Sequence, residues 1–390
     1  MVSTTSEKTS LFQVLIDSME GTNQKVCVIT SIFPPYPENV PTFRGGVSEE
    51  LSELVNKLNE KQIPCVVISL SLFGLSPENP QVKRVGKYVP YVTSKFRQVL
   101  FPFYEFFNPI IFLRMVYILR KEKPSVALFG QTYQFSVAPH LACMLTGVKR
   151  IIFFDWLCPL YPKEKACSIT ERIKECGNCM SKSDNVLLNL VIGIFSAFIF
   201  LVKKELWNSS YRIAVQSGYQ AQLFKDWGID ARKFVMAPPT STIKEDDTYT
   251  AELLKIKGEG KAICYIGRLT EDKGFDILLE AFRICTSRSR KDVKLFVAGS
   301  GHLQKETENV EYLGWVTKDK LGSVYKIADL IVVPTVVPEI HPAVVDNALE
   351  YRKKIIAFKV GSLENIIGKR GILIDEISEK ELAKSICENI

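Results

Sequence analysis

The stretch Val332-Val-Pro-Thr-Val-Val-Pro-Glu339 begins as a run of apolar residues and ends in a loop that two prolines interrupt. The next segment, Ile340-His-Pro-Ala-Val-Val-Asp-Asn-Ala-Leu-Glu350, has the pattern of a helix with Pro342 near its first turn, where the missing N–H costs little. A helix N-terminus offers free N–H groups and the positive end of the dipole, and both favour a phosphate. The sequence therefore predicts a buried strand that leads into an anion site, with Glu339 placed to accept hydrogen bonds from sugar hydroxyls.

A second strand-to-helix turn, Ile266-Gly-Arg-Leu-Thr-Glu-Asp-Lys-Gly274, lies earlier in the chain and supplies two cations. The Arg268 guanidinium can bind two phosphate oxygens at once, and the Lys273 ammonium can add a compact charge. Taken alone, a turn of this kind is usually just solvated. The order and spacing of the two stretches change this interpretation, because together they match a known family.

The segment from Ala262 to Ile374 closely resembles the C-terminal half of the retaining glycosyltransferases of family four, which have the GT-B fold. The resemblance rests on Gly267-Arg268, Lys273-Gly274, Phe296-Val-Ala-Gly-Ser-Gly301, Val310-Glu-Tyr-Leu-Gly314, Ala328-Asp329, Pro334, and Pro338-Glu339 through Leu349. It implies an α/β protein with two Rossmann-like parallel-sheet domains that face a cleft. The expected domains are an acceptor-side domain, residues 1–236, and a nucleotide-sugar-binding domain, residues 237–390.

The resemblance also implies roles for individual residues. In the family, cations at the places of Arg268 and Lys273 bind the donor diphosphate, and a glutamate at the place of Glu339 opens a Glu-x7-Glu motif and contacts the donor sugar. These three are the expected catalytic residues. The donor site is expected to include further residues of both domains: Gly45, Gly46, Gly267, Ile340 and Asn347.

Asn347 departs from the family pattern, which has a second glutamate at this place to hold the nucleotide ribose. Asparagine can still exchange hydrogen bonds with ribose hydroxyls, but it is neutral and one methylene shorter. Asp346 and Glu350 are nearby carboxylates, but helical geometry turns Asp346 about 100° and Glu350 about 60° away from the direction of Asn347. Neither is therefore a direct substitute for the second glutamate, although Glu350 is the closer of the two.

Strand and helix patterns alternate along the whole chain. Lys25 to Ser31 and Pro64 to Leu70 have the composition of buried parallel strands, and an amphipathic helix from Arg44 to Leu58 lies between them. No Gly-x-Gly-x-x-Gly motif follows the first strand, which argues against a nicotinamide-dependent dehydrogenase. Met236-Ala-Pro-Pro-Thr240 is expected to be a stiff linker.

Residues 81–123 combine nine cations and ten aromatic side chains with only two acids, Glu105 and Glu122. Three interpretations remain open: binding to an anionic membrane surface, stacking on single-stranded nucleic acid, or a helical subdomain with an aromatic core. The resemblance favours the membrane, since many members of the family act on lipid-linked acceptors. Residues 1–240 carry a formal charge of +8 and residues 241–390 a charge of −1, so the first half is expected to have an anionic partner.

Two polar residues are candidates on the acceptor side. In the family, the strand corresponding to Arg150 to Pro159 often ends in a His-Asp pair near the reacting sugar, and here the match is Phe154-Asp155. Asp155 is therefore the first candidate. His140 is the second, although a lone histidine is more often a structural hydrogen-bond partner than a catalyst.

The ten cysteines fall into a group of six and a group of four. The six, which include Cys27, Cys65 and Cys264 in apolar runs, are expected to be reduced core residues rather than part of a disulfide framework. The second group lies in a polar loop of 22 residues and ends in a Cys-x2-Cys pair suited to one tetrahedral metal: Cys158, Cys167, Cys176 and Cys179. A structural zinc site is preferred over free thiols or an iron-sulfur cluster, and no metal is expected in catalysis.

The run from Val186 to Val202 has 17 residues, at the short limit for a helix that spans a bilayer. Strand and helix patterns of the same domain follow from Arg212 to Trp227, so a helix buried in the domain or pressed into one leaflet is expected. Leu11 to Ile16 is too short and too mixed for a signal peptide. These features indicate a cytoplasmic location, with peripheral attachment to the inner face of the membrane if the basic region binds lipid.

The expected function is transfer of a sugar, of hexosyltransferase type, from a nucleotide sugar to a hydroxyl of a glycan or lipid-linked acceptor. The expected partners are those two substrates and an anionic membrane surface, and nucleic acid is disfavoured. The alternative is a catalytically degenerate GT-B protein that binds a nucleotide sugar or lipid without turnover. Asn347 and Phe154 motivate this alternative.

Overall fold

The computed structural model divides the chain into two compact units, Met1–Pro239 and Thr240–Ile390. It describes residues 10–19, 24–34, 46–71, 79–87, 106–135, 137–153, 175, 176, 179, 185–239, 242–288 and 292–390. The division lies between Pro239 and Thr240, inside the segment 236–240 that was expected to be the linker. The expected domain boundary was three residues earlier, after residue 236.

The first unit is built on a seven-stranded sheet with the order β3-β2-β1-β4-β5-β6-β7. All its pairings are parallel. The central strands are short apolar runs, buried on both faces, as parallel strands between helical layers must be. The strands are β1 (Val26–Ile29), β2 (Cys65–Ser71), β3 (Val82–Lys87), β4 (Val126–Phe129), β5 (Lys149–Phe153), β6 (Arg212–Val215) and β7 (Phe234–Met236).

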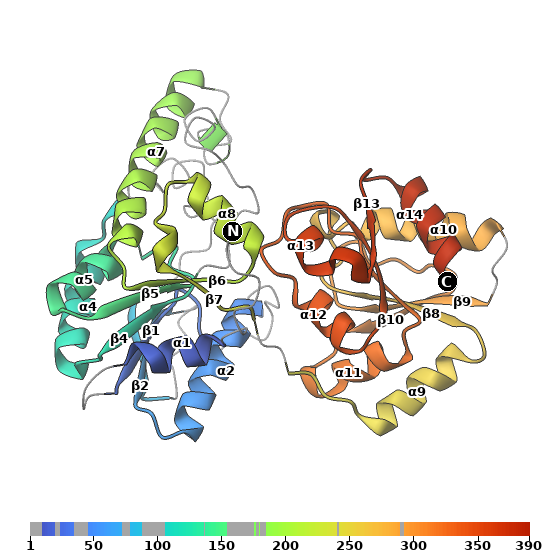
Figure 1. Cartoon of the computed structure of the whole chain (residues 1–390), viewed down its shortest axis with the longest axis horizontal. Coiled ribbons are helices and arrows are strands. Elements are labelled where there is room, and N and C mark those ends of the chain that lie inside the picture. The colour runs from blue at the N-terminus through green and yellow to red at the C-terminus, as the bar shows by residue number, and fades with distance from the viewer. Residues whose placement is uncertain are drawn as a thin grey trace. The chain divides into compact units, whose positions relative to one another are not determined.

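Helices cover both faces of this sheet (Figure 1). One face packs against α1 (Leu11–Ser18) and α2 (Gly46–Glu60). The other packs against α4 (Pro109–Glu122), α5 (Ala138–Thr146), α7 (Val186–Asn208) and α8 (Gly218–Asp226), followed by the short helix η2 (Ala231–Lys233). Side chains cap the starts of several helices: Asn108 accepts from the Ile111 N–H and Asn185 from the Leu188 N–H.

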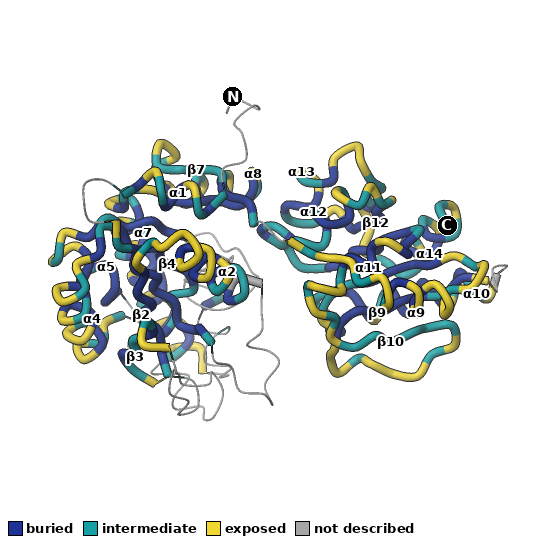
Figure 2. Tube along the Cα trace, turned by 90° about the horizontal axis from the view of Figure 1, so that it is seen from below, coloured by how far each residue is buried: buried dark blue, intermediate teal, exposed yellow. Residues whose placement is uncertain are grey.

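The second unit is built on a six-stranded sheet with the order β10-β9-β8-β11-β12-β13, again with only parallel pairings. Figure 2 shows its strands as mostly buried. The strands are β8 (Lys261–Ile266), β9 (Val293–Ala298), β10 (Val310–Gly314), β11 (Leu330–Val333), β12 (Lys354–Phe358) and β13 (Ile372–Ile374).

The second sheet is also covered on both faces. One face packs against α10 (Phe275–Arg288) and α14 (Glu379–Asn389). The other packs against α9 (Asp247–Lys257), α11 (Lys318–Ile327), α12 (Ala343–Glu350) and α13 (Leu363–Ile367), and the short helices are η3 (Glu271–Lys273) and η4 (Gly368–Arg370). Two parallel sheets between helical layers confirm the α/β architecture expected from the alternating patterns.

Part of the basic and aromatic region belongs to this framework. Its first residues form the edge strand β3, which the sequence analysis did not anticipate, and residues 88–105 lie outside the described residues. The Arg84 guanidinium donates to the backbone oxygens of Leu70 at 2.8 Å and Phe33 at 3.1 Å. This cation therefore stabilises backbone carbonyl groups of the sheet edge.

The cysteines are not all reduced. A disulfide joins Cys285 of α10 to Cys387 of α14, so the expectation that the cysteines outside the polar loop are all reduced was wrong. The two residues are 102 positions apart, and only the packing of α10 against α14 brings them together. Cys27, Cys65 and Cys264 are free and buried, as expected.

Candidate functional site

Three loops of the second unit meet where β8, β9 and β11 end. The Gly267 N–H donates to the Ala298 oxygen at 3.0 Å, and the Leu269 N–H donates to the Ser300 oxygen at 3.1 Å. The Val336 N–H donates to the Asp272 oxygen at 3.2 Å. The carboxyl ends of parallel strands lie at one edge of a sheet, where α/β proteins bind ligands. The two stretches singled out in the sequence are therefore neighbours at this edge.

Two glycines allow these loops to approach closely. Gly274 has φ +63°, and a Cβ added there would lie 1.9 Å from the backbone oxygen of Pro334. Gly361 has φ +55°, and a Cβ there would lie 2.5 Å from the Glu339 nitrogen. Both the conformation and the contact exclude a side chain, so these glycines fix the loop that carries Glu339.

Lys273 and Glu339 form an ion pair across two of the loops. The Lys273 Nζ lies 3.1 Å from Glu339 Oε1, and each side chain is 19% exposed. The Ser362 N–H, after β12, donates to the Glu339 backbone oxygen at 3.0 Å and holds the loop from the other side. A cation and a hydrogen-bond acceptor are thus fixed side by side at the edge of the sheet.

Arg268 lies in the first of these loops and is 53% exposed. Its guanidinium is 2.7 Å from the Asp272 carboxylate, four residues later. Burial alone would raise the pKa of the Asp272 carboxyl, but the positive charges of Arg268 and Lys273 help to bring it below its usual value. Asp272 therefore stays ionised and orients the guanidinium.

Tyr265 supports the same loop, and the sequence analysis missed it. Burial, followed by the negative charges of Glu339 and Asp272, raises the pKa of the Tyr265 hydroxyl well above its usual value. The hydroxyl stays protonated and donates to the backbone oxygen of Arg268. A tyrosine in a strand pattern gives no sequence signal for this role, because aromatic residues are common in strands.

The helix after Glu339 begins later than the sequence pattern indicated. Pro342 is the N-cap of α12, and no side chain forms a capping hydrogen bond there. Ile340 is buried, and the His341 imidazole forms a hydrogen bond with the Asp346 carboxylate that ties the loop to the first turn of the helix. The first N–H groups of α12 can therefore serve a ligand, as the helix dipole favours for an anion.

Asn347 lies inside the core of the second unit and is 3% exposed. It lies beside the Tyr325 hydroxyl. Burial raises the pKa of that hydroxyl above its usual value, and a hydrogen bond with the Asn347 side chain opposes the rise. Glu350 is exposed on the same helix. The residue expected to hold the ribose is thus turned into the fold in this structure.

The candidates of the first unit are not assembled into a described site. Gly45 and Asp155 lie outside the described residues, and Gly46 is the first residue of α2. His140 is 2% exposed and packs against Phe129, with ring centroids 4.6 Å apart and the two rings tilted by 37°. Burial, followed by the charges of Arg150 and Lys203, lowers the pKa of His140 well below its usual value. This environment favours a structural role for a neutral imidazole rather than contact with an acceptor.

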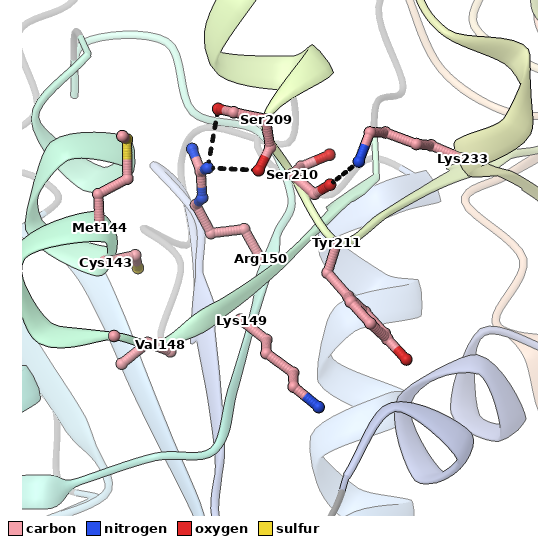
Figure 3. Close-up of a pocket in the computed structure, with 10 residues that line it drawn as sticks. Cys143, Met144, Val148, Lys149, Arg150, Ser209, Ser210, Tyr211 and Lys233 are labelled. Atoms are coloured by element: carbon pink, nitrogen blue, oxygen red, sulfur yellow. Dashed lines mark hydrogen bonds between the residues drawn. The ribbon is translucent and has the colours of Figure 1, made fainter.

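A hollow of about 420 Å³ lies at the amino ends of β5 and β6, as Figure 3 shows. The buried Arg150 guanidinium donates to the backbone oxygens of Leu206 at 3.1 Å and Ser209 at 2.8 Å. Lys233 donates to the Ser210 oxygen at 2.6 Å. These cations cap the C-terminal end of α7, and the hollow contains none of the residues predicted for the site.

The predicted zinc ligands can be followed only in part. Cys158 and Cys167 lie outside the described residues, while Cys176 is buried and Cys179 is half-buried. The four-cysteine site stays a prediction. Within the ranges the structure describes, no group of three or more metal-binding side chains is found.

Asp329, which the resemblance includes, has a structural role. Its carboxylate accepts from the Ala262 N–H at 2.8 Å and forms an ion pair of 2.6 Å with Lys257. It ties β8 and the turn before β11 to α9.

Comparison with known proteins identifies the second unit. Residues 260–390 match a family model described as "Glycosyl transferases group 1". The lipopolysaccharide 1,2-N-acetylglucosaminetransferase of Salmonella typhimurium is 28% identical over 154 residues, which are 35% of this chain and 40% of that protein. The chain spans 30% to 40% of the length of the curated relatives that it matches first.

Solved structures match nearly the whole chain. A crystal structure of HepE from Anabaena in complex with UDP and glucose has a TM-score of 0.62 and 15% identity, and the match covers 94% of this chain and 89% of that one. Sucrose-phosphate synthase from Thermosynechococcus elongatus has a TM-score of 0.64 and 15% identity, with the same coverage. The chain has a GT-B-like fold, and its second unit contains a glycosyltransferase group 1 domain.

Proposed function

We propose that this protein is a retaining glycosyltransferase that moves a sugar from a nucleotide-sugar donor to a hydroxyl of a glycan or lipid-linked acceptor. The observation that carries the proposal is the Lys273–Glu339 ion pair, which lies with Arg268 at the carboxyl edge of the matched domain. The relatives support a sugar-transfer reaction, and the Salmonella protein by its name acts on lipopolysaccharide.

The proposed chemistry is electrostatic. The bond between the anomeric carbon and the diphosphate oxygen breaks, and the electron pair leaves with the diphosphate. The acceptor oxygen bonds to the same carbon, and the proton of the acceptor hydroxyl passes to the departing diphosphate. Negative charge grows on the departing diphosphate, and Arg268 and Lys273 stabilise it in the transition state. Glu339 orients the sugar by accepting hydrogen bonds from its hydroxyls. No catalytic metal is proposed.

UDP and UDP-glucose are the first donors to test, since HepE binds them in its crystal structures. The assay follows release of the nucleoside diphosphate from each nucleotide sugar, with and without glycan or lipid-linked acceptors. Glu339→Gln should reduce the rate about 100-fold or more, because it removes a charge aimed at the reacting sugar. Glu364→Gln is the matched control, since Glu364 forms a 3.0 Å ion pair with Lys359 elsewhere in the unit.

A binding protein without turnover is the second candidate, and the burial of Asn347 in α12 favours it. It predicts nucleotide binding with no diphosphate release from any donor. If the protein releases diphosphate from one donor, and Glu339→Gln abolishes that release, this candidate is excluded.

A further inference from the structure

The exposed apolar side chains of this protein are concentrated on a few helices. Among the described residues, 17 large apolar side chains are exposed, and only four of them, Leu254, Ile256, Trp315 and Ile377, belong to the second unit. The other 13 lie on α4, α5 and α7 or just before α4: Phe107, Ile110, Leu113, Tyr117, Met144, Leu145, Val186, Leu187, Leu190, Val191, Ile194, Phe198 and Leu201. We call these 13 side chains the apolar face.

The three helices belong to one layer. Their inner sides pack on the same face of the first sheet, within one hydrophobic cluster. α4 and α5 pack against each other, and Phe106, just before α4, contacts Phe195 and Phe198 of α7 with ring centroids 5.9 and 5.7 Å apart. Figure 2 shows exposed positions along α4 and α5. The outward side chains therefore belong to one side of the unit.

The pattern along α7 is that of a surface helix with an apolar outer side. Its exposed residues recur at three- and four-residue intervals, and no charged residue occurs from Val186 to Val202. Its inner side is held in the core by Ile192, Ile199 and Phe200. Among the described helices, only α7 is long and apolar enough to cross a membrane, and 39% of its most apolar window is buried. A crossing would expose this core side to lipid and separate α7 from its sheet.

Cations border the apolar face. Arg114, Arg120, Lys121 and Lys123 are exposed on or just after α4. Within α4 the one acid is Glu122, and its carboxylate forms an ion pair with Lys25. α5 has no charged residue. An apolar surface with a positive border complements an anionic bilayer, because the side chains enter the headgroup boundary while the cations meet lipid phosphates.

We propose that the apolar face docks on the surface of an anionic lipid bilayer and that α4, α5 and α7 enter one leaflet without crossing it. The occupant is lipid rather than a second copy of this chain, because the four exposed cations on and just after α4 outnumber the one exposed acid of these helices, Glu205 of α7, so two copies would present like charges to each other. This inference goes beyond the proposed sugar transfer and does not depend on it.

The test is flotation of the purified full-length chain with vesicles of phosphatidylcholine alone and with added phosphatidylglycerol. A double variant, Leu113→Ser with Ile194→Ser, changes side chains that are 65% and 54% exposed. The matched control, Trp315→Ser with Ile377→Ser, changes side chains of the second unit that are 50% and 43% exposed. Melting curves of all variants verify that the fold is retained.

The proposal predicts that wild type and control float with anionic vesicles. The partition coefficient of the face variant should be lower than that of the wild type by at least about tenfold. Arg120→Gln with Lys121→Gln should weaken binding to anionic vesicles about fivefold for each charge removed, and should leave binding to neutral vesicles unchanged. Equal flotation of wild type and face variant would overturn the proposal, as would absence of wild-type binding to anionic vesicles. A wild-type dimer that the face variant converts to monomer would assign the face to self-association instead.

Discussion

The Lys273 ammonium lies 3.1 Å from the Glu339 carboxylate and links the turn after β8 to the loop after β11. The two side chains are far apart in sequence, yet the glycine contacts and backbone hydrogen bonds around them leave little freedom to either loop. The ion pair fixes a cation and a hydrogen-bond acceptor side by side, at the position where we propose that the diphosphate and the sugar hydroxyls of the donor bind.

Replacing Lys273 with alanine should weaken nucleotide binding. The substitution removes a charged hydrogen bond to the diphosphate, so the Kd for UDP should rise about 10- to 100-fold. Calorimetric titration measures this change. Lys326→Ala is the matched control, since Lys326 forms a 2.6 Å ion pair with Glu245 on the same unit. Equal effects of the two substitutions would contradict a specific role for Lys273.

Gly274→Ala should destabilise the second unit by more than the usual cost of placing alanine in a left-handed backbone conformation. Gly274 and Gly147 both have left-handed backbone, with φ +63° and +71°, but of the two only Gly274 would bring a Cβ against backbone, the Pro334 oxygen at 1.9 Å. Gly147→Ala should lower the free energy of unfolding by about 1 kcal/mol, and Gly274→Ala by about 3 kcal/mol or more. Urea denaturation of the two variants measures the difference, and similar values would show that the loop contact is not tight.

His140 should make the first unit less stable as the pH falls. The pKa of His140 in the fold is lowered, first by burial and then by the charges of Arg150 and Lys203. Below a pH of about 6.5 the unfolded chain binds a proton that the folded chain does not, so the free energy of unfolding falls by up to about 1.4 kcal/mol per pH unit until the folded pKa is reached.

The measurement is urea denaturation at pH 7 and pH 5 for wild type, His140→Gln and His302→Gln. His140→Gln should lower stability at both pH values and remove part of the pH dependence, while His302→Gln, at an exposed position, should change little. An unchanged pH dependence in His140→Gln would show that this imidazole does not titrate differently on folding.

The disulfide between Cys285 and Cys387 should stabilise the second unit. A bond that closes a long loop restricts the unfolded chain and typically contributes about 2–4 kcal/mol. A reductant should therefore lower the melting temperature of the wild type and have no effect on Cys387→Ser. Alkylation of both cysteines in the absence of a reductant would contradict the bond.

The fold class was predictable because strands such as β1 and β9 are short, apolar and separated by amphipathic helices. The order of strands within each sheet was not, since it depends on packing between distant segments. Strand β3 was missed because Lys83, Arg84 and Lys87 give it a polar composition, which an edge strand tolerates.

The sequence predicted that Arg268, Lys273 and Glu339 belong to one site, and the structure brings their loops together at one edge of the sheet. Their roles in binding a donor stay predictions. The site was not predictable where tertiary contacts decide the role. The Tyr265 hydroxyl supports the Arg268 loop by donating to the Arg268 backbone oxygen, and the buried Asn347 side chain forms a hydrogen bond with Tyr325 of another helix. Neither contact has a local sequence signal.

The most direct test of the account is thermal stabilisation by a panel of nucleoside diphosphates and nucleotide sugars, with Arg268→Ala and Arg283→Ala measured alongside. Arg283 is the matched control, because its 2.6 Å ion pair with Glu280 resembles the 2.7 Å pair of Arg268 with Asp272. A ligand at about 100 times its Kd adds about 2.7 kcal/mol, or about 5–10 °C in melting temperature for a unit of this size. The account predicts that one nucleotide produces such a shift in the wild type and in Arg283→Ala, and that Arg268→Ala loses it. No shift with any member of the panel, or a shift that Arg268→Ala retains in full, would contradict a donor site at this edge of the second sheet.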